Sequence, residues 1–357
     1  MSEFLKPYMI AETAYNHEGD LNYLMKMLDE IASLKLSAVK YHLLLDIASY
    51  FQKKHPLLSK LEKYLFTRNQ WKEILQESKS KGLEVIALCD DVESVKFIID
   101  EPDLADAIEL HATGLNDYFQ LSTLKDWRKK IILGIGGSTL DEIHYAVDFL
   151  NHQGNDDLLL MYGFQSYPTD YREINLSKMQ KISHLFGLPA GYADHTAFDD
   201  PHNDIISVMG AMLGFPVLEK HFTCDPGVER VDYHAAVGSE GMRRISELMN
   251  LALMIHGTGR LDMSRAERDY GNTGPMKKAL VAKRLIKKGE TITLEDLWFK
   301  RTQEQSSLRQ NQLFQVVGLK ASEDIREDEV IDFSRIQYEF KAFDLKSFTH
   351  IKKDEEK

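Results

Sequence analysis

The chain has 357 residues, of which 43% are hydrophobic and 28% are charged, as is usual for a soluble globular protein. Its 44 basic and 56 acidic residues give a net charge of −12, which argues against nucleic acid or an anionic membrane as the main partner. The first residues lack the pattern of a signal peptide, no stretch of about 20 apolar residues occurs, and Cys89 and Cys224 lie far apart. We therefore expect a cytoplasmic protein without disulfides.

Short apolar runs alternate with amphipathic segments as far as about residue 260. The predicted strands are Tyr8–Ala11, Ala38–His42, Glu84–Leu88, Ala107–His111, Lys130–Leu133, Leu158–Tyr162, Ala190–Ala193 and Val217–His221. The helices predicted between them include Leu21–Leu34, Arg68–Lys81, Leu140–Asn151, Leu176–Phe186 and Asp204–Leu213. Alternating strands and helices predict a parallel α/β fold, and eight strands favour a closed (β/α)8 TIM barrel. The absence of GxGxxG after the first strand disfavours a dinucleotide-binding sheet.

The pattern changes after this predicted barrel, which we assign to residues 1–256. Residues 257–277 are polar and glycine-containing, and they are predicted to be a linker. Residues 278–342 are predicted to form a small mixed-β domain, and residues 343–357 a charged tail. The β-like runs of this second domain are Ala279–Ala282, Thr291–Thr293, Gln315–Ala321 and Val330–Ile331.

Two of the predicted barrel strands lead directly into a histidine. LPAGYA precedes Asp194 and His195, and FPVLE precedes Lys220 and His221. Residues at the carboxyl ends of barrel strands meet at one mouth, so two neutral imidazoles could hold one divalent cation there and leave positions open for substrate. A hydrogen-bonded core histidine is the alternative at each position.

Several motifs resemble, in chain order, those of the sialic acid synthase family: AETAYNHEGD, VKYH, SYPTDY, GLPAGYADHT and VLEKHFTCD. The segment ALVAKRLIKKGETITLEDLWFKR resembles the antifreeze-like (SAF) domain of that family. The resemblance implies condensation of phosphoenolpyruvate with an N-acetylated amino sugar aldehyde, such as N-acetylmannosamine, to a sialic-acid-like 2-keto acid. It also implies a divalent metal, with Mn²⁺ favoured over Mg²⁺ or Zn²⁺, and a homodimer in which each SAF domain reaches over the partner's barrel.

The resemblance also implies roles for individual residues. His195 and His221 match the metal ligands, and Glu12 matches a carboxylate that moves a proton and orients the sugar. Lys40 matches a contact to the donor's carboxylate, and Asp232 an acidic catalytic residue, with a one-residue slip near His234 as the alternative. The residues that match or replace substrate contacts are His42, Glu109, Gln165, Tyr167 and Arg301, the last of which would close the partner's site.

The positions expected to hold the donor's phosphate depart from the family pattern. A Lys-Ile-Gly-Ser stretch is replaced by residues that begin with Glu109 and end with Ala112, a Ser-Thr-Gly run begins here with Gly134, and a serine is replaced by Ala193. These changes remove charge-assisted hydrogen bonds and add a repulsive carboxylate. Three hypotheses stay open. The first is a synthase that uses phosphoenolpyruvate; the second is a relative that uses a non-phosphorylated donor such as pyruvate, or another aldehyde, with Asp90, Glu109 and His111 lining the site; the third is a non-catalytic sugar-binding homologue. The complete set of matched catalytic and metal-binding residues disfavours the third.

Overall fold

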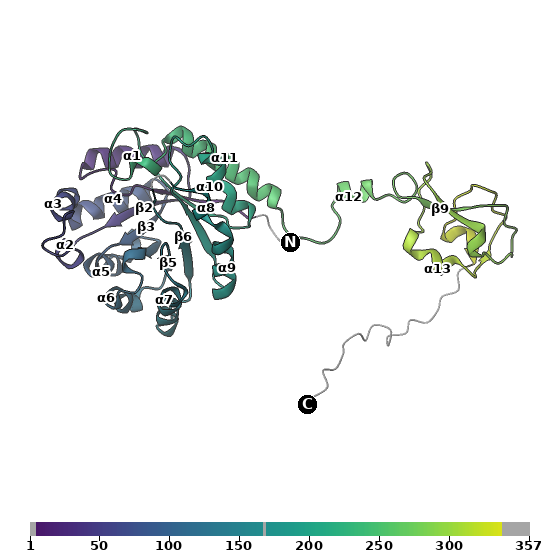
Figure 1. Ribbon diagram of the computed structural model, residues 1–357, viewed down its shortest axis with the longest axis horizontal. Coiled ribbons are helices and arrows are strands. Elements are labelled where there is room, and N and C mark those ends of the chain that lie inside the picture. The colour runs from purple at the N-terminus through teal and green to yellow at the C-terminus, as the bar shows by residue number, and fades with distance from the viewer. Residues whose placement is uncertain (1–4, 167–168, 338–357) are drawn as a thin grey trace, which may run out of the picture. The chain divides into compact units, whose positions relative to one another are not determined.

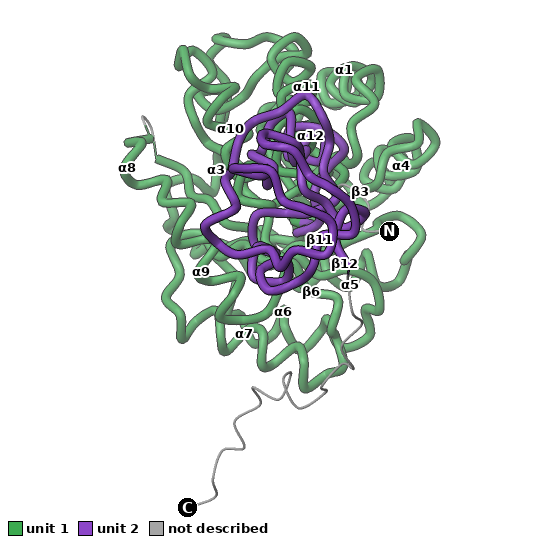
Figure 2. The backbone as a smooth tube through the Cα atoms, turned by 90° about the vertical axis from the view of Figure 1, so that its right-hand side faces the viewer, with its two compact units in different colours: residues 1–259 green, residues 260–357 purple. Residues whose placement is uncertain are grey.

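The computed structural model describes residues 5–166 and 169–337 (Figure 1). The chain divides into two compact units, residues 1–259 and residues 260–357 (Figure 2). Tyr167, a predicted sugar contact, lies outside the described residues. So do residues 338–342 of the predicted second domain and the predicted tail.

The first unit is a closed barrel of parallel strands in sequential order, in which β1 pairs with β8. Its strands are β1 Tyr8–Glu12, β2 Ala38–Leu43, β3 Glu84–Cys89, β4 Ala107–Leu110, β5 Lys130–Gly134, β6 Leu158–Tyr162, β7 Ala190–Asp194 and β8 Val217–His221. The predicted TIM barrel is confirmed, and every predicted strand agrees with an observed one to within one residue at each end. The agreement is close because barrel strands are apolar on both faces and are bounded by polar turns.

Helices surround this barrel (Figure 1). They are α1 Leu21–Ser33, α2 Ile47–Tyr50, α3 Leu58–Leu61, α4 Arg68–Ser80, α5 Val92–Asp100, α6 Tyr118–Thr123, α7 Leu140–His152, α8 Tyr171–Ile174, α9 Leu176–Phe186, α10 Asn203–Met212 and α11 Ser239–His256. Thr67 and Thr139 begin α4 and α7 with capping boxes, which satisfy backbone N–H groups of the first turn. Among the described residues, no helix combines the length and the apolar character needed to cross a membrane.

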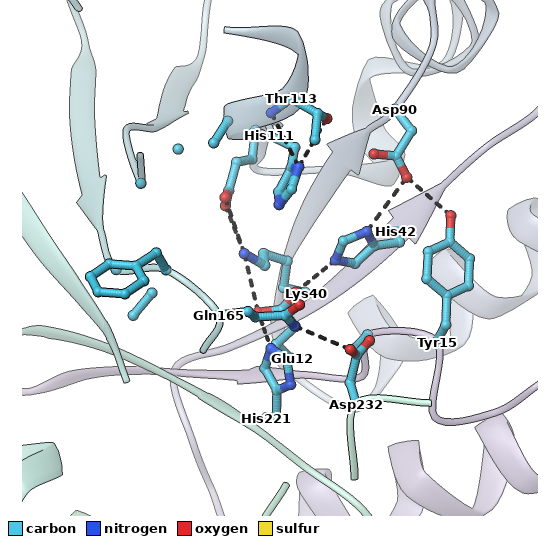
Figure 3. Close-up of a pocket in the computed structure, with 18 of the residues that line it drawn as sticks. Glu12, Tyr15, Lys40, His42, Asp90, His111, Thr113, Gln165, His221 and Asp232 are labelled. Atoms are coloured by element: carbon cyan, nitrogen blue, oxygen red, sulfur yellow. Dashed lines mark hydrogen bonds and ion pairs between the residues drawn. The ribbon is translucent and has the colours of Figure 1, made fainter. Parts of the chain in front are cut away.

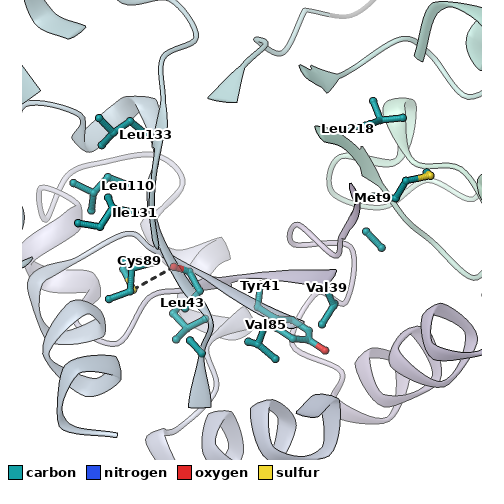
Figure 4. Packing of buried hydrophobic residues seen from close by; sticks show 14 of the residues in the cluster. Met9, Val39, Tyr41, Leu43, Val85, Cys89, Leu110, Ile131, Leu133 and Leu218 are labelled. Carbon is teal, nitrogen blue, oxygen red and sulfur yellow. Dashed lines mark hydrogen bonds between the residues drawn. The ribbon is translucent and has the colours of Figure 1, made fainter. Parts of the chain in front are cut away.

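Successive side chains along each strand point alternately outward and inward, so the core of the barrel has two layers. Outward-facing side chains such as Val39, Tyr41 and Leu43 belong to the layer between strands and helices (Figure 4). Inward-facing side chains such as Ile10 and Ala38 fill the barrel interior. Because the period is two residues, the next inward positions after this apolar layer lie at the carboxyl ends of the strands. Those positions carry the polar residues of the site.

The second unit contains two small antiparallel sheets, one of β9 with β10 and one of β11 with β12. Its elements are α12 Arg265–Tyr270, β9 Ala279–Ala282, β10 Leu297–Lys300, α13 Leu313–Val316, β11 Lys320–Ala321 and β12 Ile336–Gln337. The strand predicted at Gln315–Ala321 is wrong in its first part, because α13 ends at Val316, whose side chain faces the core. Thr291 and Val330 form single β-bridges, and α12 lies within the predicted linker.

Candidate active site

A pocket of about 660 Å³ lies at the carboxyl ends of the barrel strands (Figure 3), a size suited to a small molecule. Of the ten residues predicted for the site, the eight that line this pocket are Glu12, Lys40, His42, Glu109, Gln165, His195, His221 and Asp232. Tyr167 is not described, and Arg301 belongs to the second unit, where its guanidinium donates to the Pro275 carbonyl at 2.6 and 3.0 Å. The barrel therefore brings together residues that are up to 220 positions apart in the chain.

Strand register explains why these side chains meet. Glu12 ends β1 directly opposite Lys40 on β2 and His221 on β8. Glu109 on β4 and Glu219 on β8 also belong to inward-facing positions and line the pocket. Neighbouring strands lie about 4.8 Å apart, so long side chains at such positions reach one another.

Lys40 is the centre of a buried ionic cluster. Its Nζ atom lies 2.7 Å from Glu219, 3.1 and 3.2 Å from the two carboxylate oxygens of Glu109, and 3.3 Å from Glu12. Burial alone would lower the pKa of Lys40, but Glu109, Glu12 and Glu219 together raise it. Burial raises the pKa of Glu109 and, more strongly, that of Glu219, and the attraction of Lys40 offsets only part of each shift. Lys40 is therefore a cation that three carboxyl groups already surround.

His42 lies between two acidic residues. Its Nε2 atom lies 2.7 Å from Glu12, and its Nδ1 atom lies 3.5 Å from Asp90, which also accepts a hydrogen bond of 3.0 Å from the Tyr15 hydroxyl (Figure 3). Burial alone would lower the pKa of His42, but its contacts with Asp90 and Glu12 raise it to about 10. Burial alone would likewise raise the pKa of Glu12, yet Lys40 and His221 hold it well below its usual value. His42 is thus an imidazolium and Glu12 a carboxylate at neutral pH.

His195 and His221 lie side by side at the mouth, with ring centroids 4.9 Å apart and an edge-on arrangement. Burial, reinforced by His221, lowers the pKa of His195 to about 3, so its ring is the neutral form that binds metals. The Nδ1 atom of His221 is buried and has no hydrogen-bond partner among the described residues. An unsatisfied ring nitrogen beside a neutral imidazole fits a cation site. Within the described part of the chain, no group of three or more His, Cys, Asp or Glu side chains is arranged to hold a metal ion.

Two further predicted residues, Gln165 and Asp232, meet at the mouth of the barrel. Gln165 donates its side-chain amide to Asp232 at 3.1 Å (Figure 3). Asp232 has a φ of 62°, a left-handed conformation that is uncommon for a residue with a side chain and that recurs at functional sites. An amide and a carboxylate presented together are suited to hydrogen-bonding sugar hydroxyl and N-acetyl groups.

The segment between β2 and α4 forms the outer wall of the pocket. Tyr50, Phe51, Leu57 and Leu61 line this wall, so it is largely aromatic and aliphatic. The ring of Phe51 stacks on His55, with centroids 4.2 Å apart. Such a wall is suited to the apolar face or acyl group of a bound sugar.

Glu219 is a pocket residue for which the sequence motifs suggested no role. It lies two positions before His221 on β8, and the two-residue period alone places both side chains on the inner face. Asp90 and His111 follow the ends of β3 and β4, where they line the pocket. The second hypothesis placed both in the site, which agrees with their position after a barrel strand, since such residues form the mouth of the barrel.

Two family models match the chain. The one described as NeuB family matches residues 30–260, and the one described as SAF domain matches residues 277–337. A relative from Campylobacter jejuni named N,N'-diacetyllegionaminic acid synthase is 28% identical over 341 residues, which span 91% of this chain and 99% of that protein.

Solved structures share the fold at lower identity. A putative spore coat polysaccharide biosynthesis protein E from Chromobacterium violaceum has a TM-score of 0.79 with 22% identity, over 93% of this chain and 100% of that one. The sialic acid synthetase of Leptospira borgpetersenii has a TM-score of 0.67 with 22% identity, over 74% of this chain and 90% of that one. The chain is therefore an enzyme of the NeuB family with a C-terminal SAF domain.

Proposed function

We propose that this enzyme joins a three-carbon enol or keto acid to the aldehyde carbon of an N-acetylated amino sugar, in a metal-dependent aldol-type condensation. The observation that carries the proposal is the pair of imidazoles at the barrel mouth, with His221 Nε2 3.3 Å from Glu12 Oε2. Phosphoenolpyruvate is the donor that the sequence motifs favour. With that donor, water is consumed, phosphate leaves, and the product is a sialic-acid-like 2-keto acid.

A divalent cation would supply Lewis acidity toward the aldehyde oxygen, which gains negative charge as the carbon–carbon bond forms. His195 and His221 would hold it, and Mn²⁺ is the first choice because nitrogen ligands from histidine and oxygen ligands from substrate and water suit it. Mg²⁺ and Zn²⁺ are the alternatives.

The other pocket residues have roles that follow from their contacts. Glu12, an ionised carboxylate against His221, moves the proton of the oxygen at the reacting carbon. Gln165 and Asp232 orient the sugar, and the wall that contains Phe51 receives its acyl group. Because these residues at the mouth bind the sugar, the donor must bind deeper in the barrel, near Lys40.

We also propose the homodimer that the family resemblance implies, with Arg301 of each SAF domain closing the barrel of the partner. Arg301 is exposed, its guanidinium donates to the Pro275 carbonyl and to the Met276 sulfur within its own unit, and no arginine lines the described pocket. A planar cation supplied from outside would complete recognition of a substrate carboxylate.

The test is a product assay. Protein loaded with Mn²⁺ is incubated with N-acetylmannosamine or its 2,4-diacetamido analogue, together with either phosphoenolpyruvate or pyruvate, and 2-keto acid product is measured by mass spectrometry. Metal-dependent product with at least one donor, abolished by EDTA and absent from H195A, supports the proposal. Absence of product with every pairing in the panel, or product that is indifferent to EDTA, overturns it.

A further inference from the structure

The part of the pocket that would receive the donor is rich in acidic side chains. Lys40 is the one lysine in the described lining, and no arginine is present there. The acidic residues that line the pocket are Glu12, Asp90, Glu109, Glu219 and Asp232. The imidazolium of His42 is already held between Glu12 and Asp90. In the described lining, a dianionic phosphate entering this region would meet the ionised Glu12, while Lys40 and His42 each already have acidic partners.

Lys40 itself is not available to an incoming phosphate. Its side chain is 2% exposed, and Glu109 contacts its Nζ atom with both carboxylate oxygens, at 3.1 and 3.2 Å. Glu219 approaches the same atom at 2.7 Å. A phosphate could reach the ammonium group only by displacing a carboxylate, which would leave that buried carboxylate without its partner. Breaking one side of a buried ion pair in this way is strongly unfavourable.

In the described lining, the neighbouring wall offers no lysine or arginine in place of Lys40. It is formed by small residues, namely Ala112, Gly134, Gly136, Gly163 and Ala193. Gly136 and Gly163 leave no room for anything larger, because a Cβ atom at Gly136 would lie 1.9 Å from the Gly163 carbonyl oxygen and one at Gly163 would lie 2.0 Å from the Ala193 carbonyl oxygen. Tight phosphate sites usually combine backbone N–H groups with a cationic side chain, and the cationic side chain is missing from this wall.

We infer that Glu109 makes this barrel selective for a donor without phosphate, a short 2-keto acid of which pyruvate is the simplest. The inference rests on the proposed function and specifies its donor. A carboxylate of the pocket removes a proton from C3 of the keto acid, and the resulting electron pair forms the bond to the aldehyde carbon. The carbonyl π electrons of the aldehyde become an alkoxide, which takes a proton back. All atoms of the two substrates are kept in the product, a 4-hydroxy-2-keto acid. The reaction releases no phosphate, consumes no water and needs no redox partner.

The first experiment compares donors on the unmodified enzyme. Mn²⁺-loaded protein is given the aldehyde panel with pyruvate or with phosphoenolpyruvate, and both keto acid and inorganic phosphate are measured. Product from pyruvate, with phosphate release from phosphoenolpyruvate at least tenfold slower, is the expected result. Phosphate release that matches or exceeds the pyruvate rate overturns this inference and leaves the proposed function intact. Product from neither donor overturns the proposed function itself, so the two failures are distinguishable.

The second experiment tests Glu109 directly by calorimetric titration with phosphoenolpyruvate and with inorganic phosphate. Wild type is expected to show no saturable binding at millimolar ligand. Glu109→Lys supplies a second ammonium group and is expected to show saturable binding with a Kd at least roughly tenfold below the lower limit set by wild type, while Glu109→Gln, which releases Lys40 from one carboxyl group, lowers the Kd less. Glu73→Lys on the exposed face of α4 is the matched control for charge and should behave as wild type. If Glu109→Lys does not fold, the Kd of Glu109→Gln compared with that of wild type tests the inference. An unchanged Kd in the folded variants overturns the role of Glu109.

Discussion

The imidazole of His42 and the carboxylate of Glu12 lie 2.7 Å apart across the first two strands of the barrel. Glu12 is also 3.3 Å from both Lys40 and His221, so groups from two neighbouring strands converge on one carboxylate. Three nitrogen-bearing partners hold Glu12 in one orientation and keep it ionised. The position of Glu12 is therefore set by its buried partners before any substrate binds.

The first prediction concerns the pH dependence of stability. Asp90 and Glu12 raise the pKa of His42 from 6.5 to about 10, so the imidazolium stabilises the folded state fully below about pH 6.5, and this contribution is lost as the pH rises through about 10. Urea unfolding of wild type and His42→Gln should therefore show a stability difference at pH 6 that shrinks toward pH 10. His184→Gln, an exposed change on α9, serves as control. A difference that stays constant over this range would show that His42 is not charged in the folded protein.

The second prediction concerns proton transfer. Glu12→Gln keeps the shape of the side chain and removes its charge, so kcat should fall by roughly 10²- to 10⁴-fold, the usual contribution of a general acid or base. Metal content should stay near that of wild type, because Glu12 is not one of the proposed ligands. Glu73→Gln provides the matched surface control. A kcat within tenfold of wild type would remove Glu12 from the chemical step.

The third prediction concerns the metal. His195→Ala and His221→Ala should each abolish stoichiometric uptake of Mn²⁺, since the pair supplies the protein's nitrogen ligands and one ring alone binds weakly. Bound metal is measured by elemental analysis after gel filtration, with His184→Ala as control. Full metal content in both ligand variants would locate the cation elsewhere.

The strands and the positions of the main site residues were predictable from sequence because a barrel strand carries two kinds of information. Its apolar length shows where it lies, and the residue at its carboxyl end faces the mouth. Glu12 and His221 end their strands, His195 follows the end of β7, and Lys40 lies within β2; all four line one pocket. Glu219 obeys the same two-residue period as His221 and could have been predicted from it.

The remaining features depend on contacts that no local pattern encodes. The pairing of Lys40 with Glu109 joins residues 69 positions apart, and Tyr15 reaches Asp90 across 75 positions. The sequence predicted repulsion between Glu109 and a phosphate. The ion pair between Lys40 and Glu109 is visible only in the folded barrel. In the second unit, β11 and β12 have two residues each, which is too short for any periodic signal.

The fourth prediction concerns an ion pair on the outer face of the barrel strands β7 and β8. Lys220 lies 2.7 Å from Asp194, their side chains are 0% and 1% exposed, and Ser207 on α10 donates a further hydrogen bond to Asp194. Lys220→Met leaves a buried carboxylate without its cation and should lower the free energy of unfolding by about 3–5 kcal/mol. Urea unfolding measures the change, with Lys278→Met at an exposed position as control. A loss below about 1 kcal/mol, typical of surface ion pairs, would contradict the expectation.

The fifth prediction concerns Arg301 and the proposed dimer. Arg301→Ala should reduce kcat/KM while leaving urea unfolding nearly unchanged, because the side chain is exposed and its hydrogen bonds to Pro275 and Met276 lie at the surface of its own unit. Mixing Arg301→Ala subunits with His195→Ala subunits distinguishes the two ways in which Arg301 could act. If each SAF domain serves the partner's barrel, a mixed dimer contains one barrel with intact histidines and an Arg301 from the other chain, so activity returns on subunit exchange. If Arg301 serves its own barrel, every site in the mixture lacks one group and activity stays at the reduced level of the Arg301→Ala subunits. Light scattering that reports a monomer would remove the dimer and the exchange argument together.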